Sequence, residues 1–257
     1  MLGQVTAARC ISVPLFAALL VSCGIQKFTV TDSSIEGRIP PGATMLAGVH
    51  LDRLRESSLF QQLPPSAAAL LAPWQDAVTV LAASNGPDYV VLARGTFAQP
   101  PAGSTLLEPG LAGMGTAEYL KQTKSPSRRN PLFDSVGPLA ATSEIWAIAA
   151  GGANLPLSGN AENFNRLLHR TRYAALSVKL TDHVMLDIAG ICANPDAARE
   201  LEETVRAMIT LGGAFSRKDP VTGGLLKRIQ LDREGNAVRI SLTVSPAELE
   251  AVLKLFS

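Results

Sequence analysis

The stretch of sequence that decides the fold class is LKRIQLDREGNAVRISLTV, which covers residues 226–244. From Val238 onward, apolar side chains recur at every second position, which is the period of a β-strand with one buried face. The Glu-Gly-Asn in the middle is typical of a turn between two strands. We therefore predict a hairpin with strands at residues 226–233 and 237–244. Polar residues fill the alternate positions, so one sheet face contacts water at least in part, as antiparallel sheets allow.

Helix signals lie on both sides of this hairpin. The Ser-Pro-Ala-Glu sequence at residues 245–248 matches a capping box with proline at the first helical position. Upstream, Asn194 as N-cap and Pro195 as the first helical residue start a longer helix, which we expect to end at Gly212 and Gly213. The apolar face of this longer helix consists of Ala197, Leu201, Val205, Met208 and Leu211, and that of the C-terminal helix consists of Leu249, Val252, Leu253 and Phe256.

The rest of the chain repeats strand and helix signals. The clearest are two further hairpins, one around Asn-Gly-Pro-Asp at residues 85–88 and one around Asp182 and His183. In chain order, the predicted elements are a strand at residues 45–51, a helix from Asp52, a helix at 66–77, strands at 78–83, 89–97 and 104–107, a short helix capped by Thr116, a strand at 145–150, a helix at 161–170, and strands at 174–180 and 184–188.

These elements predict an α+β fold of two similar strand-helix-hairpin-helix lobes with mostly antiparallel sheets. We place the first lobe at residues 43–123, an inter-lobe loop at 124–143, and the second lobe with the C-terminal hairpin and helix at 144–257. Residues 89–100 align with residues 184–195 at an offset of 95, which places Gly95 on Gly190, Ala98 on Ala193 and Pro100 on Pro195. The alignment favours an internal duplication, but three identities leave that interpretation open.

The amino end carries the features of an export signal. Arg9 is the only charged residue before Lys27, and an apolar run follows at residues 11–21. A membrane-spanning helix needs about 20 apolar residues, whereas the apolar core of a cleavable signal has about 7–15. We therefore predict a signal peptide at residues 1–22.

The end of this signal, Leu20, Val21 and Ser22, followed by Cys23, resembles the lipobox of bacterial lipoproteins. The resemblance implies that the Cys23 thiol receives a diacylglyceryl group and that the signal is cleaved just before Cys23. It also implies that the new amino group of Cys23 is acylated with a fatty acid such as palmitate. Two other interpretations stay open, an ordinary cleaved signal with an incidental cysteine and an uncleaved anchor. Under the lipobox interpretation, residues 23–42 are the lipidated cysteine and a flexible tether.

The charge composition excludes one class of partner. Residues 1–22 contain one of the 23 Lys and Arg and none of the Asp and Glu, which leaves 22 positive against 22 negative residues from Cys23 onward. A net charge of zero argues against nucleic acid as a partner, and against electrostatic docking on anionic lipid as the main tether. Of the three cysteines, only Cys192 lies downstream of Cys23, and its apolar surroundings predict a buried side chain without an internal disulfide.

The sequence offers no recognisable pattern of a catalytic or metal site. His50 and Asp52 are neighbours in sequence, but no G-x-S-x-G motif accompanies them, and no C-x-x-C or H-E-x-x-H pair is present. Residues 110–116 are rich in glycine but lack the lysine of a P-loop, so we interpret them as a turn with close backbone packing. We therefore predict no catalytic residue, no metal and no cofactor.

One basic cluster stands out, consisting of Lys121, Lys124, Arg128 and Arg129. It is interpreted either as a mobile, solvated loop or as an anion contact, to a lipid headgroup or to the acidic patch of a partner. Because no aromatic residue interleaves with these charges, the cluster does not favour nucleic acid.

The leading functional hypothesis is a lipid-anchored bacterial envelope protein, held at the membrane through Cys23, that binds a protein partner or an envelope component without catalysis. We expect it to face the periplasm, and the Gly24 after the cysteine favours the outer membrane. The first alternative is a carrier or sensor of a small apolar ligand, which requires an enclosed cavity of several hundred Å³. An envelope hydrolase is the third hypothesis.

Overall fold

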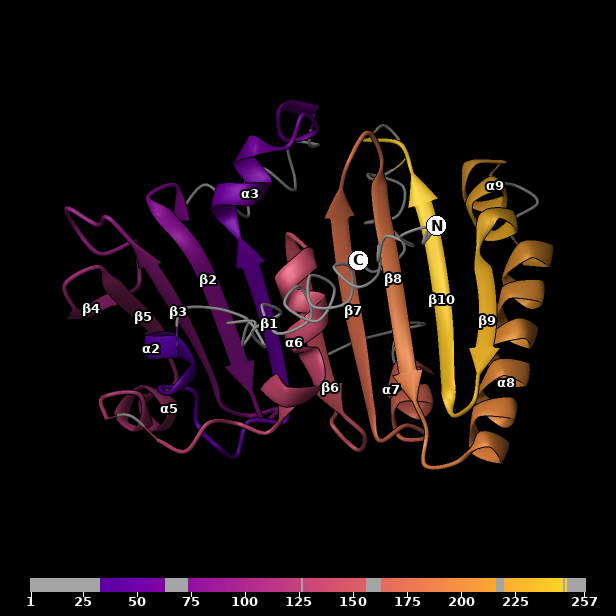
Figure 1. The fold of residues 1–257 in the computed structure, drawn as a ribbon, viewed down its shortest axis with the longest axis horizontal. Helices are drawn as coiled ribbons and strands as arrows, with labels where there is room; N and C mark the ends of the chain where they lie inside the picture. Colours follow the sequence, from indigo (N-terminus) through magenta and orange to yellow (C-terminus); the bar gives the residue numbers. More distant parts are fainter. Residues whose placement is uncertain are drawn as a thin grey trace, which may run out of the picture.

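The computed structural model describes residues 33–62, 74–125, 127–155, 163–215, 220–246 and 248. Its centre is a ten-stranded sheet in which neighbouring strands are antiparallel (Figure 1). The strands are β1 (Met45–His50), β2 (Ala77–Ser84), β3 (Tyr89–Gly95), β4 (Thr105–Glu108), β5 (Leu111–Gly115), β6 (Ile145–Ala150), β7 (Tyr173–Leu180), β8 (Val184–Ile191), β9 (Gln230–Glu234) and β10 (Ala237–Val244). Their order across the sheet is β4-β5-β3-β2-β1-β6-β7-β8-β10-β9. The predicted α+β class with antiparallel pairing is confirmed.

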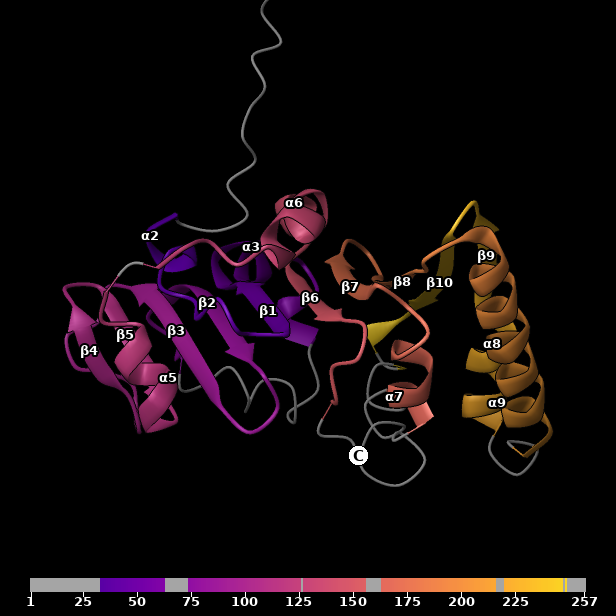
Figure 2. The ribbon, with the colours of Figure 1, turned by 90° about the horizontal axis from the view of Figure 1, so that it is seen from below.

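Helices cover both faces of this sheet. They are α2 (Ser33–Glu36), α3 (Leu51–Glu56), η1 (Phe60–Gln62), α5 (Ala117–Gln122), α6 (Leu132–Thr142), α7 (Asn163–Leu168), α8 (Pro195–Phe215) and α9 (Pro220–Arg228). Figure 2 shows α2 and α6 on one side of the sheet and α7, α8 and α9 on the other. The sheet is therefore the middle layer, and its alternating side chains feed a separate apolar cluster on each side.

The main apolar cluster lies under α2 and α6. It combines Leu46 and Leu81 from the first half of the sheet with Trp146 and Ile148 from the second, and Phe133 of α6 packs on them. The ring of Phe133 meets the indole of Trp146 edge to face, with centroids 6.4 Å apart. The two halves of the chain thus share one core.

The prediction of two lobes is wrong, because β1 and β6 pair with each other in the middle of a single sheet. Their sequences, MLAGVH and IWAIAA, are apolar on both faces. An apolar strand with unpaired backbone groups is unfavourable at a sheet edge, so each strand is stabilised by the other. The edges of the sheet are instead the short strand β4 and the charged strand β9.

The strand order repeats outward from this central pair. From β1 the neighbours are β2, β3, β5 and β4, and from β6 they are β7, β8, β10 and β9, in the same sequence of hairpins. The two halves can be aligned by placing the first residue of β1, Met45, on the first residue of β6, Ile145. The strand pairings then place Tyr89 of β3 on Leu186 of β8. The sequence alignment at an offset of 95 matched Tyr89 with Val184, so it differs from the observed register by two residues.

Most predicted strands and hairpins are confirmed, and several helix ends differ from the prediction. Asn194 caps α8 as predicted, because the backbone N–H of Ala197 donates to its side-chain oxygen at 2.9 Å. The helix nevertheless continues past Gly212 and Gly213 to Phe215. Residues 226–228, predicted as strand, form the end of α9. The predicted helix at 66–77 lies largely outside the described residues, and its last residue begins β2.

The start of the predicted C-terminal helix shows one half of the expected capping box, the contact of the Glu248 carboxylate with the N–H of Ser245. The backbone N–H and the hydroxyl of Ser245 both donate to the carboxylate of Glu248 at 2.9 Å. The rest of that helix lies outside the described residues, so its prediction is untested.

The predicted inter-lobe loop at residues 124–143 is also wrong in its second part. Residues 132–142 form α6, despite Pro138 inside the helix. Proline removes one backbone hydrogen bond and usually disfavours a helix interior. Here Phe133, Val136 and Ala140 share the buried face, and their burial outweighs that loss.

The predicted flexible tether at residues 23–42 is wrong over its described part. Ser33–Glu36 is a helical turn, and Ile35 and Ile39 are fully buried in the main apolar cluster. The signal peptide of residues 1–22 and the lipid-attachment residue Cys23 lie outside the described residues. Among the described residues, no helix is long and apolar enough to cross a membrane.

Candidate functional site: the docked N-terminal segment

The first described residues after Cys23 form a segment that is docked on the folded body. In this docked segment, residues 34–43, Ile35 and Ile39 are each 0% exposed and share a cluster with Phe133 and Val136 of α6. Full burial of an isoleucine side chain contributes about 1.5–3 kcal/mol to stability. The docked segment is therefore part of the core, and it connects the fold to the proposed lipid-attachment residue.

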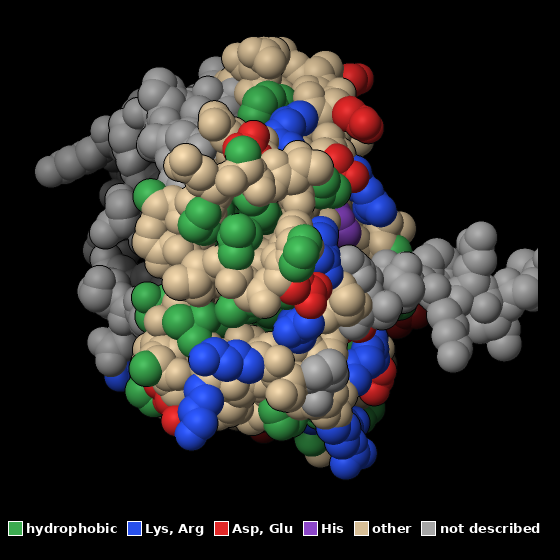
Figure 3. Space-filling model, turned by 90° about the vertical axis from the view of Figure 1, so that its left-hand side faces the viewer, with side chains coloured by type: hydrophobic (Ala, Val, Ile, Leu, Met, Phe, Trp, Pro, Cys, Tyr) green, Lys and Arg blue, Asp and Glu red, His purple; other side chains and the backbone are tan. Residues whose placement is uncertain are grey.

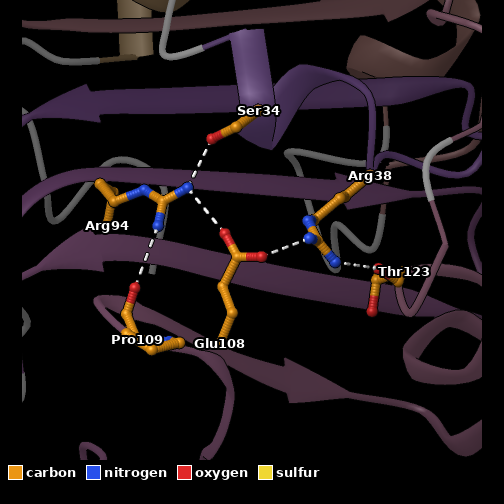
Figure 4. Close-up of polar contacts among 6 residues, drawn as sticks. All are labelled: Ser34, Arg38, Arg94, Glu108, Pro109 and Thr123. Atoms are coloured by element: carbon orange, nitrogen blue, oxygen red, sulfur yellow. Dashed lines mark hydrogen bonds and ion pairs between the residues drawn. The ribbon is translucent and has the colours of Figure 1, made fainter.

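Two arginines and one glutamate hold this segment at the edge of the sheet (Figure 4). Glu108 of β4 accepts hydrogen bonds from Arg38 at 2.5 Å and from Arg94 of β3 at 3.1 Å, one on each carboxylate oxygen. Arg38 also donates to the carbonyl of Thr123 at 3.1 Å, and Arg94 donates to the hydroxyl of Ser34 at 2.5 Å. We call Arg38, Arg94 and Glu108 the Glu108 clamp.

The chemistry of the Glu108 clamp is that of a structural contact. Both oxygens of the Glu108 carboxylate face a guanidinium group, so the negative charge is compensated. The three side chains are only partly exposed, which reduces screening of the ion pairs by salt. The clamp is thus suited to fixing the docked segment on β3 and β4, and less suited to proton transfer.

A second ion pair holds the first turn of the docked segment. Arg129 donates from Nε to the buried carboxylate of Glu36 at 2.7 Å and also pairs with Asp134. Its guanidinium group lies 5.2 Å from the ring centroid of Phe133. Burial alone lowers the pKa of Arg129, but the hydrogen bonds and charges of Glu36 and Asp134 outweigh it and raise the pKa. Arg129 therefore stays charged and paired.

Backbone hydrogen bonds complete the attachment. The N–H of Ser127 donates to the carbonyl of Gly37 at 2.6 Å. The fully buried side chain of Asn130 donates to the carbonyl of Ala43 at 2.9 Å and accepts from the N–H of Leu132 at 2.9 Å. The segment that connects α5 to α6 thus binds the docked segment along most of its length.

The predicted basic cluster separates into two parts in the structure. Arg129 is used internally, as described above. Lys121, Lys124 and Arg128 are exposed, and none of the three forms an ion pair with another described residue. These three residues, which we call the basic patch, are the uncompensated part of the cluster.

His50 and Asp52 do not form a catalytic pair in the structure. His50 is buried at the end of β1, with Nε2 3.1 Å from the carbonyl oxygen of Ala140 in α6. Because a carbonyl can only accept, Nε2 carries the proton. Burial, and then the charge of Arg53, lower the pKa of His50. Asp52 is exposed on α3, so His50 acts as a neutral link between β1 and α6.

The glycine-rich residues 110–116 were predicted as a turn, and that prediction is mostly wrong. Only Gly110, with φ +74°, belongs to a turn, whereas Leu111–Gly115 is strand β5. The expected close backbone packing is present, because a Cβ on Gly115 would lie 2.2 Å from the carbonyl oxygen of Tyr89. Glycine therefore permits the close pairing of β5 with β3.

A small hollow lies between α6 and the open face of β7, β8 and β10. Its volume is about 40 Å³, and Leu139, Ser177, Asp187 and Arg239 contribute to its walls. A water molecule fits this space, whereas ligand sites are usually about 300–1,000 Å³. The hollow therefore gives no support to the hypothesis of an apolar-ligand carrier.

The remaining reactive side chains are not gathered into a site. Cys192 is buried, as predicted, and its burial raises the pKa of the thiol. In the part of the chain that the structure describes, no three His, Cys, Asp or Glu residues come together to hold a metal ion.

The Glu108 clamp and the role of Asn130 were not predicted from the sequence. A signal was present in Ile35 and Ile39, two large apolar residues in a stretch that was otherwise interpreted as a tether. Arg94 in an otherwise apolar strand was a second signal, because a charged residue on a buried face requires a partner. The identity of that partner depends on the pairing of β3, β5 and β4, which the sequence does not reveal.

Comparisons with known proteins identify the fold alone. No family model matches the chain, and no curated protein matches it. Crystal form I of TP0453 superposes with a TM-score of 0.50 at 14% identity, and crystal form III with a TM-score of 0.52 at 11% identity. Each match covers 87% of this chain and 98% of the other. At this identity the likeness establishes a shared fold.

Proposed function

We propose that this chain is a lipid-anchored bacterial envelope protein that acts by binding or assembly, without catalysis. The observation that carries the proposal is the docked segment. Ser33 is ten positions after Cys23, a length of chain that spans at most about 35 Å when fully extended. A lipid on Cys23 would therefore hold the folded body close to the bilayer and attach it at one defined place.

The geometry of the docked segment supports anchoring. Ile35, Ile39, the Glu108 clamp and Asn130 together fix the start of the fold against the sheet edge and α6. A freely jointed tether would leave the body free to rotate, whereas a docked one limits which face meets the membrane. Such a constraint suits a protein that presents a surface to a partner.

Two side chains that a hydrolase could use, His50 and Glu108, are engaged in structural contacts, which supports a non-enzymatic role. His50 is used as a hydrogen-bond donor to α6, and the carboxylate of Glu108 is neutralised by two arginines. The carrier and hydrolase hypotheses stay as alternatives, and neither gains a specific observation from the described residues.

The proposal also covers the amino-terminal signal and the location of the protein. Residues 1–22 serve as a lipoprotein signal peptide, Cys23 is the acylated residue, and the body faces the periplasm. The outer membrane is favoured by Gly24. An envelope protein or another envelope component is the expected partner.

We further propose that the two halves arose by internal duplication. The repeated strand order on the two sides of the β1–β6 pair supports this, independently of the three sequence identities. Relatives of this chain provide the test. Halves that align better at the observed strand registers than at the offset of 95 would support duplication, and halves that never align above chance would oppose it.

The anchoring proposal is tested by growing cells that produce the full chain with labelled palmitate. We expect label on the parent chain, none on Cys23→Ala, and a mature amino terminus at Cys23. Cys192→Ala is the matched control and should retain the label. An unlabelled parent chain whose amino terminus is not Cys23 would contradict anchoring.

The binding role is tested by chemical cross-linking of the parent and Cys23→Ala chains in the native envelope. We expect one envelope component to be captured by the parent and lost with Cys23→Ala. Turnover of an envelope substrate by the purified chain, abolished by a single point substitution, would overturn the non-enzymatic role.

A further inference from the structure

We propose that the basic patch, Lys121, Lys124 and Arg128, contacts anionic headgroups of the bilayer that holds the anchor. This inference rests on the proposed anchoring through Cys23. It adds a second contact with the membrane, located on the folded body.

The patch has the charge that such a contact requires. All three side chains are exposed, and none is compensated by an ion pair with another described residue. Glu118, the acid on the same helix, accepts a hydrogen bond from the neutral amide of Gln122 at 3.0 Å and keeps its charge. Residues 117–128 thus carry three positive charges against one negative charge, although the chain from Cys23 onward has a net charge of zero.

The position of the patch connects it to the anchor. Arg38 of the docked segment donates to the carbonyl of Thr123, and Ser127 donates to the carbonyl of Gly37. Thr123 lies between Lys121 and Lys124 in the sequence, and Ser127 directly precedes Arg128. The chain that leads from Cys23 into the fold is thus bound directly to the segment that carries the patch.

The surface around the patch has the composition of an interfacial contact. Figure 3 shows Lys and Arg side chains over the lower part of the face formed by the β4 edge, with hydrophobic side chains and some Asp and Glu side chains beside them. Leu106 on edge strand β4 is 46% exposed. Basic side chains beside apolar ones are typical of surfaces that bind the headgroup region of a bilayer.

A bilayer is a better fit for this patch than an acidic protein. A lipid anchor keeps the membrane within reach at all times, so even weak contacts add to a high effective concentration. Each Lys or Arg near an anionic surface strengthens binding by about fivefold. Three such residues are therefore sufficient to orient a body that the anchor already holds.

The test measures binding to vesicles of the unlipidated mature chain, residues 23–257 with Cys23→Ala, which lacks the apolar signal. Vesicles of phosphatidylglycerol mixed with phosphatidylcholine are compared with vesicles of phosphatidylcholine alone by flotation. We expect binding only to the anionic vesicles at about 0.1 M salt, and its loss at about 1 M salt, where screening is strong. Lys121→Gln, Lys124→Gln and Arg128→Gln in the same chain should reduce the binding constant at least tenfold.

The matched control replaces three exposed cations of the other half, Arg172, Lys227 and Arg239, by Gln. It changes the net charge equally and should retain most of the binding. Equal loss in both triple variants, salt-insensitive binding, or equal binding to both kinds of vesicle would overturn the inference. Binding of the chain through this patch to an acidic envelope protein, without binding to anionic vesicles, would also overturn it.

The salt dependence of the Cys23→Ala chain tests the inference even if the patch variant fails to fold. The two proposals also fail separately. Palmitate labelling decides whether Cys23 is an anchor, and vesicle binding without the lipid decides whether the patch recognises headgroups.

Discussion

Gly48 and Trp146 face each other across the β1–β6 pair, and their contact shows how tightly single residues are fitted in this core. A Cβ on Gly48 would lie 2.3–2.5 Å from three atoms of the Trp146 indole. Trp146 is fully buried and in contact with Phe133, so the ring has little room to move away. Glycine at this position allows the indole to lie over β1 and join the two halves of the sheet.

We expect Gly48→Ala to lower the free energy of unfolding by about 1–3 kcal/mol, the usual cost of overpacking a core. Urea denaturation measures the change. Gly213→Ala is the matched control, because Gly213 lies in α8 with no atom within 4 Å of an added Cβ. That substitution should raise stability by up to about 1 kcal/mol, since alanine favours a helix more than glycine does. A neutral Gly48→Ala would show that Trp146 can adjust its position.

His50 gives the molecule a defined response to pH. Burial and the charge of Arg53 lower its pKa below the ordinary value of 6.5, so the folded state favours the neutral ring. Below pH 6.5 the unfolded chain binds a proton that the folded chain resists. The contribution of His50 to stability is therefore fully present above pH 6.5 and is lost as the pH falls toward the lowered pKa.

We expect His50→Gln to reduce the loss of stability between pH 8 and pH 5. Glutamine can still donate to the carbonyl of Ala140, but it does not titrate. Urea denaturation of both chains at the two pH values gives the difference, in which the contribution of the carboxylates cancels. His183→Gln, in an exposed turn, should respond as the parent does. If the parent and His50→Gln lose equal stability, His50 is not the group that responds.

At the scale of elements, burial of Ile35 and Ile39 makes the docked segment part of the fold. We expect Ile39→Ala to lower the free energy of unfolding by about 2–5 kcal/mol, as for other buried large-to-small substitutions. Leu106→Ala on the exposed edge of β4 is the control and should change it by less than about 0.5 kcal/mol. Unchanged global stability, with faster trypsin cleavage after Arg38, would show that the segment detaches on its own.

The sequence predicted the strands better than the helices, for physical reasons. The period-two pattern of β10 and the turn before β3 are local features, so they could be recognised without the fold. The helix at residues 132–142 was hidden by Pro138 and depends on burial of Phe133 against the sheet. Tertiary burial outweighs local propensity in such cases, and sequence patterns do not contain it.

The candidate site was predictable only in part. The basic patch could be recognised from sequence, since charged residues stay exposed unless they are paired. The sequence did not reveal that Arg129 is separate from the basic patch, because Glu36, the partner of Arg129, is 93 positions away. The Glu108 clamp likewise joins residues from β3, β4 and the docked segment that only the sheet topology brings together.

At the scale of the whole molecule, the central β1–β6 pair makes one sheet out of two similar halves. Each half has an edge strand on its outer side, and on the inner side β1 and β6 pair with each other. The main apolar cluster contains Leu46 and Leu81 from one half and Trp146 and Ile148 from the other. Loss of either half would therefore expose the part of the main apolar cluster that the other half contributes.

We therefore expect the two halves to unfold together, although chains longer than about 150 residues often unfold through intermediates. In the Trp74→Phe variant, Trp146 is the only tryptophan, and its fluorescence reports on the β1–β6 contact. Far-ultraviolet circular dichroism reports on all ten strands at once. The two urea transitions should coincide, because the indole leaves its buried site only when the whole sheet is lost. A fluorescence transition that precedes the loss of the sheet would show that the halves separate first and that each is stable without the other.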